Sequence, residues 1–182
     1  MNKLKLVMVG NGMAGVRTLE ELLRLAPDLY EITVFGAEPH PNYNRILLSP
    51  VLAGEQSFAD IVLNGIEWYQ QHGIDLRLGR KVVAIDRKRR VVTADDGSTS
   101  QYDRLILATG SNPFILPVPG NRLEGVIAYR DIADTEAMIE AAYAAWRADM
   151  RLADGLPAEW EGRDVVLAGV VASLSQDFER GV

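Results

Sequence analysis

The 182-residue sequence contains no cysteine and only two histidines, His40 and His72. Without thiols the chain can form neither a disulfide nor a thiolate-ligated zinc or iron–sulfur site. Two histidines are also too few for a self-contained zinc site of the usual kind. Any redox chemistry must therefore depend on a bound cofactor.

The sequence also lacks a long hydrophobic run and an excess of positive charge. Every strictly apolar stretch falls short of the roughly 18 residues that a membrane span needs. Nineteen Lys and Arg against 25 Asp and Glu give a formal net charge of −6, which disfavours nucleic acid or an anionic membrane as the main partner. Lys3 and Lys5 superficially imitate the start of a signal peptide, but Gly10 ends the apolar run early. We therefore expect a cytoplasmic protein that acts on small molecules.

Hydrophobic periodicity predicts a strand, a helix and a second strand within the first 36 residues. Residues 4–9 form a short apolar run that suits a buried parallel strand. Apolar residues then recur every three or four positions from Met13 until Pro27, and residues 31–35 are β-rich again. The result is a βαβ unit, whose short loops favour a right-handed parallel crossover.

The remaining sequence predicts a long loop followed by short strands and a second helix. Residues 36–57 form an irregular segment of a length that usually binds a ligand or is disordered, and its mixed content, which includes Tyr43, favours binding. The expected elements beyond it are a helix at 67–72, strands at 74–78, 81–86, 90–94 and 102–108, and a helix starting near Asp131 or Asp134. The predicted fold class is α/β, with a Rossmann-like central parallel sheet and an inserted antiparallel β-meander.

Residues 10–15, here called the glycine loop, read Gly-Asn-Gly-Met-Ala-Gly and lie directly between the first predicted strand and helix. In that context a GxGxxG pattern indicates a dinucleotide site. Gly10 would permit the tight turn, Gly12 would let a pyrophosphate approach the backbone, and Gly15 would let the helix lie close to the strand. The phosphate charge would then meet free N–H groups at the helix N-terminus. The alternative is an ordinary glycine-rich turn.

Two other features support a dinucleotide. Glu38 lies about 20 residues past the glycines, where an acidic residue binds the ribose in dinucleotide folds. The predicted strand 102–108 ends in the small residues Ala108, Thr109 and Gly110, which let the chain pass close to a bound cofactor. A solvated loop residue and an ordinary strand-ending turn are the alternatives.

Together these motifs resemble the FAD-binding region of the two-dinucleotide-binding flavoprotein reductases. The segments that carry this resemblance are the glycine loop, YDRLILATG at 102–110 and LPVPG at 116–120. More narrowly, ITVFGAE at 32–38, YNRILLSPVLAGE at 43–55 and EWY at 67–69 resemble the amino-terminal region of the large subunit of NAD(P)H-dependent assimilatory nitrite reductases. The similarity covers about residues 3–142. Pro50 stands where ferredoxin-type reductases usually carry a lysine, which favours the nitrite reductase type.

This resemblance implies an oxidoreductase that binds FAD. With the loop glycines included, the predicted cofactor-binding residues are Gly10, Gly12, Met13, Ala14, Gly15, Glu38, Arg45, Val83, Ala108, Thr109, Gly110 and Arg130. The Arg45 guanidinium can neutralise a pyrophosphate or pair with the flavin edge, and Val83 would offer its backbone to the adenine. Ion pairs at the surface or at a helix end are the alternatives for the two arginines. No residue is predicted to act as a catalytic acid, nucleophile or metal ligand.

The resemblance ends near residue 142. We expect residues 1–142 to form an apparently incomplete FAD-binding domain, and residues 143–182 to hold a helix end, a linker and a truncated start of a second nucleotide-binding segment. Gly169 stands there without the other glycines of a second loop. A truncation or reading-frame change would explain this ending, and the uncovered sheet of a half-built domain would favour a homo-oligomer.

In the parent enzyme that the resemblance implies, electrons would pass from NAD(P)H through FAD to a sirohaem and iron–sulfur module outside this chain. We expect little or no NADH oxidation by the chain alone. The alternatives are a fragment of a ferredoxin- or rubredoxin-type reductase and a catalytically silent, truncated binding module.

Overall fold

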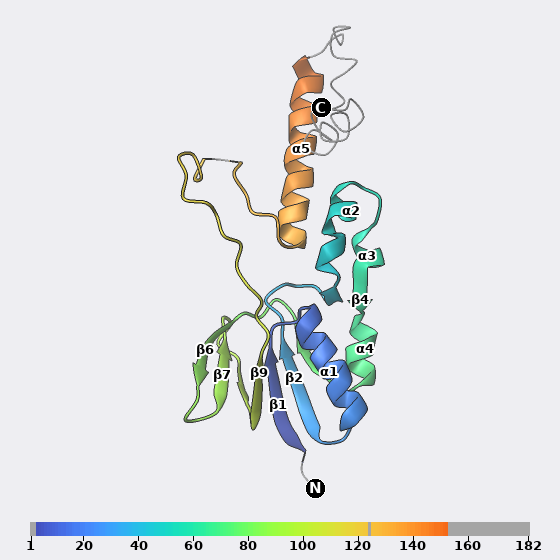
Figure 1. The fold of residues 1–182 in the computed structure, drawn as a ribbon, viewed down its shortest axis with the longest axis vertical. Helices are drawn as coiled ribbons and strands as arrows, with labels where there is room; N and C mark the ends of the chain where they lie inside the picture. Colours follow the sequence, from blue (N-terminus) through green and yellow to red (C-terminus); the bar gives the residue numbers. More distant parts are fainter. Residues whose placement is uncertain (1–2, 124, 153–182) are drawn as a thin grey trace. The chain divides into compact units, whose positions relative to one another are not determined.

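The computed structural model describes residues 3–123 and 125–152, which belong to two compact units. Of these residues, the first unit comprises 3–44 and 61–112, and the second comprises 45–60, 113–123 and 125–152. The predicted helix end at 143–152 is described. The predicted linker and the predicted second nucleotide-binding segment lie outside the described residues. Figure 1 shows the elements of both units.

The first unit is built on a four-stranded parallel sheet with the strand order β5-β2-β1-β9. Its strands are β1 (Leu4–Val9), β2 (Tyr30–Phe35), β5 (Asp75–Arg77) and β9 (Arg104–Leu107). Helix α1 (Met13–Leu25) connects β1 to β2, which pair in parallel with Leu6 opposite Ile32. The predicted βαβ unit and central parallel sheet are therefore confirmed.

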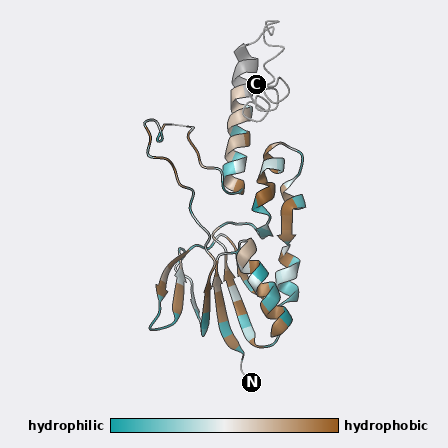
Figure 2. Cartoon of the chain, in the orientation of Figure 1, coloured by the Kyte–Doolittle hydropathy of each residue, from teal (hydrophilic) through white to brown (hydrophobic). Residues whose placement is uncertain are grey.

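Side chains alternate between the two faces of a sheet along each strand, and the central strands β1 and β2 contribute buried side chains to both faces. One face packs against α1 and α4 (Ile66–Gln71). That cluster consists of Leu6, Met8, Val16, Leu19, Ile32, Val34, Tyr69 and Ile74. The cluster on the other face consists of Val7, Val9, Phe35, Val92 and Ala94. Figure 2 shows how strongly the hydrophobic residues concentrate on these strands.

Val92 and Ala94 of the second cluster belong to an antiparallel sheet, which is inserted in the chain between β5 and β9. Its strands, in the order β6-β7-β8, are β6 (Val82–Asp86), β7 (Val91–Ala94) and β8 (Thr99–Gln101). The predicted antiparallel meander is confirmed. The register skips Val83, since Val82 pairs with Ala94 and Ala84 pairs with Thr93. Val83 is therefore a β-bulge residue.

The predicted strand at 74–78 is β5, which forms the edge of the parallel sheet. The structure differs from the sequence-based expectation in two places. Strand β8 lies within a polar stretch that has no apolar alternation to reveal it. The predicted irregular segment contains the short elements β3 (Asn42–Tyr43), η1 (Arg45–Leu47) and α2 (Leu48–Leu52). Strand β3 pairs with β4 (Val62–Asn64), which follows α3 (Phe58–Ile61).

In the second unit, α5 (Ile132–Leu152) contacts α2. The Asp134 backbone N–H donates a hydrogen bond of 3.0 Å to Asp131 Oδ1, while Asp134 Oδ2 accepts bonds from the backbone N–H groups of Arg130 and Asp131. Asp131 is thus the N-cap, and Asp134 completes a reciprocal cap from the first turn. Of the two predicted starting points, Asp131 is the capping residue.

Across the described ranges, none of the helices combines the length and the apolar character that crossing a membrane would require.

The burial pattern of α1 gives a first prediction. Leu19 is fully buried in the first cluster, whereas Leu25 on the same helix is 70% exposed. We expect Leu19→Ala to lower the free energy of unfolding by about 3 kcal/mol, because it removes buried methyl groups and leaves a cavity. Leu25→Ala should change it by less than about 0.5 kcal/mol. Urea denaturation measures both, and equal losses in the two variants would contradict the packing described here.

Candidate cofactor-binding site

Gly10, the first residue of the glycine loop, makes a close backbone contact with Ala108. Its N–H donates to the Phe35 carbonyl at 2.8 Å, and its φ is +108°. A Cβ atom at this position would lie 2.2 Å from the Ala108 carbonyl oxygen. The chain directly after β1 therefore touches the chain directly after β9, and only glycine fits there.

Gly15 also brings α1 close to these strand ends. A Cβ atom at Gly15 would lie 3.0 Å from both Ala108 Cβ and Met8 Sδ. A distance of 3.0 Å is shorter than nearly all contacts that real Cβ atoms make, so a larger residue would not fit here without a shift. The first turn of α1 therefore packs directly against the ends of β1 and β9. Ala108, one of the predicted site residues, is itself small enough to permit this approach.

Gly12 has the opposite environment. It is the N-cap of α1 with an extended backbone, at φ −87° and ψ 173°. Apart from Gly12 itself and its two chain neighbours, no described residue has an atom within 4 Å of the place where a Cβ would be.

The start of α1 carries no side-chain cap and no acidic residue in its first turn. The first intrahelical bond joins the Val16 N–H to the Gly12 carbonyl at 3.0 Å. The N–H groups of the first turn, which includes Met13 and Ala14, precede that bond and carry the partial positive charge of the helix. An anion is the ligand that this arrangement favours.

Glu38 lies beyond β2 and is fixed by two neighbours. The Tyr43 hydroxyl donates a hydrogen bond of 2.6 Å to Glu38 Oε2, and the Gly79 N–H donates to the Glu38 carbonyl at 3.0 Å. Tyr43 is buried, so this contact fixes the position of Glu38 Oε2. This role of Tyr43 was not predicted, although Tyr43 belongs to the segment 43–55, which carries part of the family resemblance.

The remaining predicted residues of the first unit are accessible. Thr109 and Gly110 follow β9, both are exposed, and Gly110 has a φ of +70°. Val83 is 60% exposed, and its bulge leaves it out of the pairing between β6 and β7.

Arg45 and Arg130 belong to the second unit, and the structure brings these two residues together. The Arg45 guanidinium donates a hydrogen bond of 3.1 Å to the Arg130 carbonyl. The Arg130 N–H in turn donates to Asp134 Oδ2 at 2.8 Å, just before α5 begins. The two predicted cations are therefore connected to one helix start.

The structure adds two polar residues that the sequence reasoning did not assign to the site. Asn11 is the second residue of the glycine loop, and its Oδ1 accepts a hydrogen bond of 2.7 Å from the Tyr69 hydroxyl. Tyr69 lies on α4 and is 1% exposed. Burial raises the pKa of Tyr69 to about 12, and this effect outweighs the hydrogen bonds with Asn11 and with the Asn42 backbone, which lower it. Periodicity could identify Tyr69 only as a core residue, since its hydroxyl contact is long-range.

Comparison with known proteins gives consistent matches. Residues 4–150 match the family model described as pyridine nucleotide-disulphide oxidoreductase. The chain is 54% identical over 141 residues to the nitrite reductase [NAD(P)H] of Bacillus subtilis (strain 168), covering 78% of this chain and 18% of that protein. It is 52% identical over 142 residues to the assimilatory nitrate reductase electron transfer subunit of the same organism, with the same two coverages.

Among solved structures, a ferredoxin reductase of Rhodopseudomonas palustris matches with a TM-score of 0.69 and 26% sequence identity, over 77% of this chain and 34% of that one. This match agrees with the Rossmann-like arrangement of the parallel sheet. The chain spans 18% of the length of each of the two Bacillus proteins that it matches.

The contact between Gly10 and Ala108 gives a second prediction. Gly10→Ala should lower the free energy of unfolding by at least about 2 kcal/mol, through both a strained φ and a clash. Gly97 is the matched control, because its φ is +81° but a Cβ there would meet no described atom within 4 Å beyond its own chain neighbours. Gly97→Ala should therefore lower the free energy of unfolding only through the strained φ, by about 1–2 kcal/mol. Urea denaturation compares them, and a smaller loss at Gly10 would contradict the close approach.

The Tyr69 hydroxyl gives a third prediction. Its pKa rises from 10.0 to about 12 on folding, so between those values the unfolded chain loses the proton more readily than the folded one. Folding stability should therefore fall as the pH rises from about 10 to about 12. Tyr69→Phe should remove this component, whereas Tyr30→Phe should keep it. Urea denaturation near pH 8 and pH 11 tests it, and an equal alkaline loss in wild type and Tyr69→Phe would refute it.

Proposed function

The chain belongs to the pyridine nucleotide-disulphide oxidoreductase family, and from this premise we propose that its glycine loop binds the pyrophosphate of FAD. The observation that carries the proposal is the contrast within the loop. Gly10 and Gly15 are closed in by backbone and side chains, while Gly12 faces free space beside an uncapped helix start. A phosphate needs both that space and those N–H groups.

Other residues of the first unit fit the same group. Glu38 follows β2 and can accept hydrogen bonds from ribose hydroxyls, with Tyr43 fixing one of its oxygens. Val83 has its backbone outside the strand pairing, which suits a hydrogen bond to an adenine edge. The exposed residues Thr109 and Gly110 allow a cofactor to pass over the end of β9. Arg45 and Arg130 stay predictions from the family resemblance.

FAD, when bound, would supply the electron-transfer chemistry, as cofactors generally do in such proteins. The residues of this chain would bind it, orient it and neutralise its charge. NAD(P)H is the electron donor that we propose for the parent protein, and a sirohaem and iron–sulfur module is the acceptor. The names of the two Bacillus relatives support a role in nitrite or nitrate reduction. We propose a cytoplasmic location, where NAD(P)H is available.

A second candidate is a reductase of a small electron carrier. The likeness to a ferredoxin reductase at a TM-score of 0.69 favours it, whereas the 54% identity to a nitrite reductase favours the first candidate. The coding sequence of the parent protein discriminates the two. A continuation with cysteines spaced for a sirohaem and iron–sulfur centre supports the nitrite reductase role, and its absence supports the electron-carrier reductase.

The proposed pyrophosphate position gives a fourth prediction. Serine is a favoured N-cap residue and fits the free space at Gly12, so Gly12→Ser should leave the free energy of unfolding of the cofactor-free chain equal or slightly higher. The same side chain would occupy the phosphate position and cap the helix. FAD affinity should therefore fall by about tenfold or more.

The measurement is the visible spectrum of the purified chain after incubation with FAD and removal of free flavin. The wild-type chain should retain flavin absorbance, and the Gly12→Ser variant should lose it. A wild-type chain that retains none would contradict FAD binding. Retention by both proteins would show that the pyrophosphate lies elsewhere.

A further inference from the structure

Tyr69 is the largest fully buried side chain in the described part of the protein, yet it carries a hydroxyl group. Its ring packs in the first hydrophobic cluster and meets Trp68 edge-on, with 5.0 Å between ring centroids. Phenylalanine would supply the same ring without a polar atom to satisfy. The hydroxyl instead donates to Asn11 in the glycine loop at 2.7 Å. This bond links the core to the loop that we propose binds the pyrophosphate.

Asn11 is also confined from another side. A Cβ atom at Gly36, which follows β2, would lie 3.1 Å from Asn11 Cβ. The Asn11 side chain is thus bounded by Gly36 and Tyr69. Gly10 and Gly12 flank it in the chain, and glycines have more backbone freedom than any other residue. A fixed side chain between two glycines restricts the loop further, in addition to the contact of Gly10 with Ala108.

The Asn11 amide is held by one end only. Its Oδ1 accepts from Tyr69, while its Nδ2 is buried and has no hydrogen-bond partner among the described residues. A buried, unpaired amide is unfavourable for folding alone. Its presence in the loop is better explained by a role in binding than by a role in stability.

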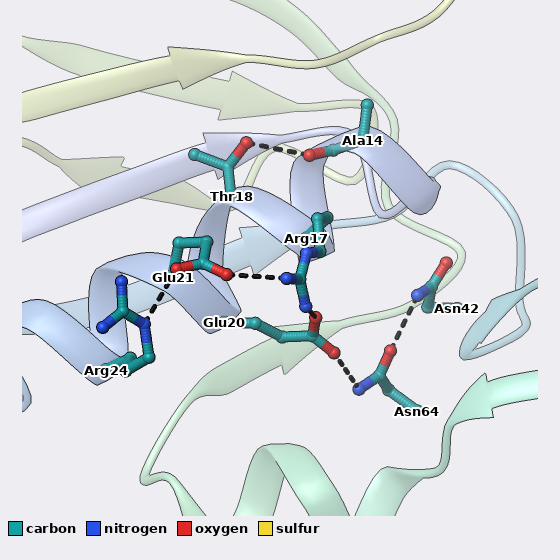
Figure 3. Close-up of polar contacts among 8 residues, drawn as sticks. All are labelled: Ala14, Arg17, Thr18, Glu20, Glu21, Arg24, Asn42 and Asn64. Atoms are coloured by element: carbon teal, nitrogen blue, oxygen red, sulfur yellow. Dashed lines mark hydrogen bonds and ion pairs between the residues drawn. The ribbon is translucent and has the colours of Figure 1, made fainter.

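A chain of polar contacts connects the Tyr69 hydroxyl to Asn42, Asn64 and Glu20. The backbone of Asn42 hydrogen-bonds to it. Asn42 Nδ2 donates to Asn64 Oδ1 at 2.8 Å, and Asn64 Nδ2 donates to Glu20 Oε1 at 3.0 Å, as Figure 3 shows. Hydrogen bonds from Asn64 and then from Arg17 hold the pKa of the Glu20 carboxyl below its usual range. The network therefore connects the outer face of α1 with the loop at its start.

We propose that Tyr69 is a positioning residue: through its hydrogen bond to Asn11 it holds the glycine loop in the conformation that admits a pyrophosphate. This inference rests on the proposed function and extends it to a residue that would not itself touch the cofactor. A loop that is already ordered in the free protein loses less conformational entropy when the ligand binds, and the ligand therefore binds more tightly. The hydroxyl should therefore affect ligands with a pyrophosphate and not ligands without one.

The test compares ADP with adenosine as probes, by isothermal titration calorimetry of the full chain. The wild-type chain should bind ADP more tightly than adenosine. Tyr69→Phe should weaken ADP binding by about tenfold, the effect of one lost hydrogen bond, and leave adenosine binding unchanged. Tyr30→Phe is the matched control: Tyr30 packs against the same cluster but begins β2, at the end of the strand away from the loop. It should change neither affinity.

Asn11→Ala provides a second variant that leaves the core aromatic in place. It should reproduce the tenfold loss for ADP, and the double variant Asn11→Ala with Tyr69→Phe should lose no more than either single variant. A double variant whose losses multiply would overturn the inference, because the two side chains would then act independently.

Hydrogen exchange of the ligand-free chain separates positioning from general stability. The Gly10 and Val16 amides are hydrogen-bonded at the two ends of the loop. Both should exchange about tenfold faster in Tyr69→Phe while the amides of β1 and β2 stay unchanged. Uniform acceleration, or none, would overturn the inference.

The two proposals fail in distinguishable ways. If the wild-type chain binds ADP no more tightly than adenosine, the proposed function fails and the inference fails with it. If the wild-type chain prefers ADP and Tyr69→Phe retains that preference in full, only the inference fails.

Discussion

The close approach of Gly10 to the Ala108 carbonyl is the constraint on which the rest of the first unit depends. It joins the chain after β1 to the chain after β9, so two strands separated by about a hundred residues end at one place. Gly15 then lets α1 descend on the same point. With α1 so placed, its apolar face covers the sheet and its N-terminus faces the strand ends, which is where α/β folds bind their ligands.

The three glycines of the loop differ in how much free space surrounds them. Two glycines are needed because neighbouring atoms leave no room, and Gly12 is needed because a ligand must come near. Asn11, the polar residue among them, is held by a hydroxyl from the core. The same six residues therefore combine close packing, an open helix start and a fixed side chain, which together make a binding loop from a βα turn.

The sequence predicted the features that depend on local pattern, and it failed where a contact spans distant residues. Strand β1 and helix α1 match the predicted run and periodicity, and the glycine spacing pointed to the loop. Strand β3 was missed because two residues cannot show a period, and its pairing with β4 depends on Asn42 meeting Asn64. The roles of Tyr69 and Tyr43 were not predicted, since nothing in the local sequence reveals that their hydroxyls reach Asn11 and Glu38.

The most direct test of the central claim is a two-dimensional amide NMR titration of the isotopically labelled chain with ADP. If the glycine loop holds a pyrophosphate, the largest shift changes should fall on the amides of Gly12, Met13, Ala14 and Gly15, with smaller ones near Glu38. Shift changes that are absent, or that centre on other parts of the chain, would contradict the account.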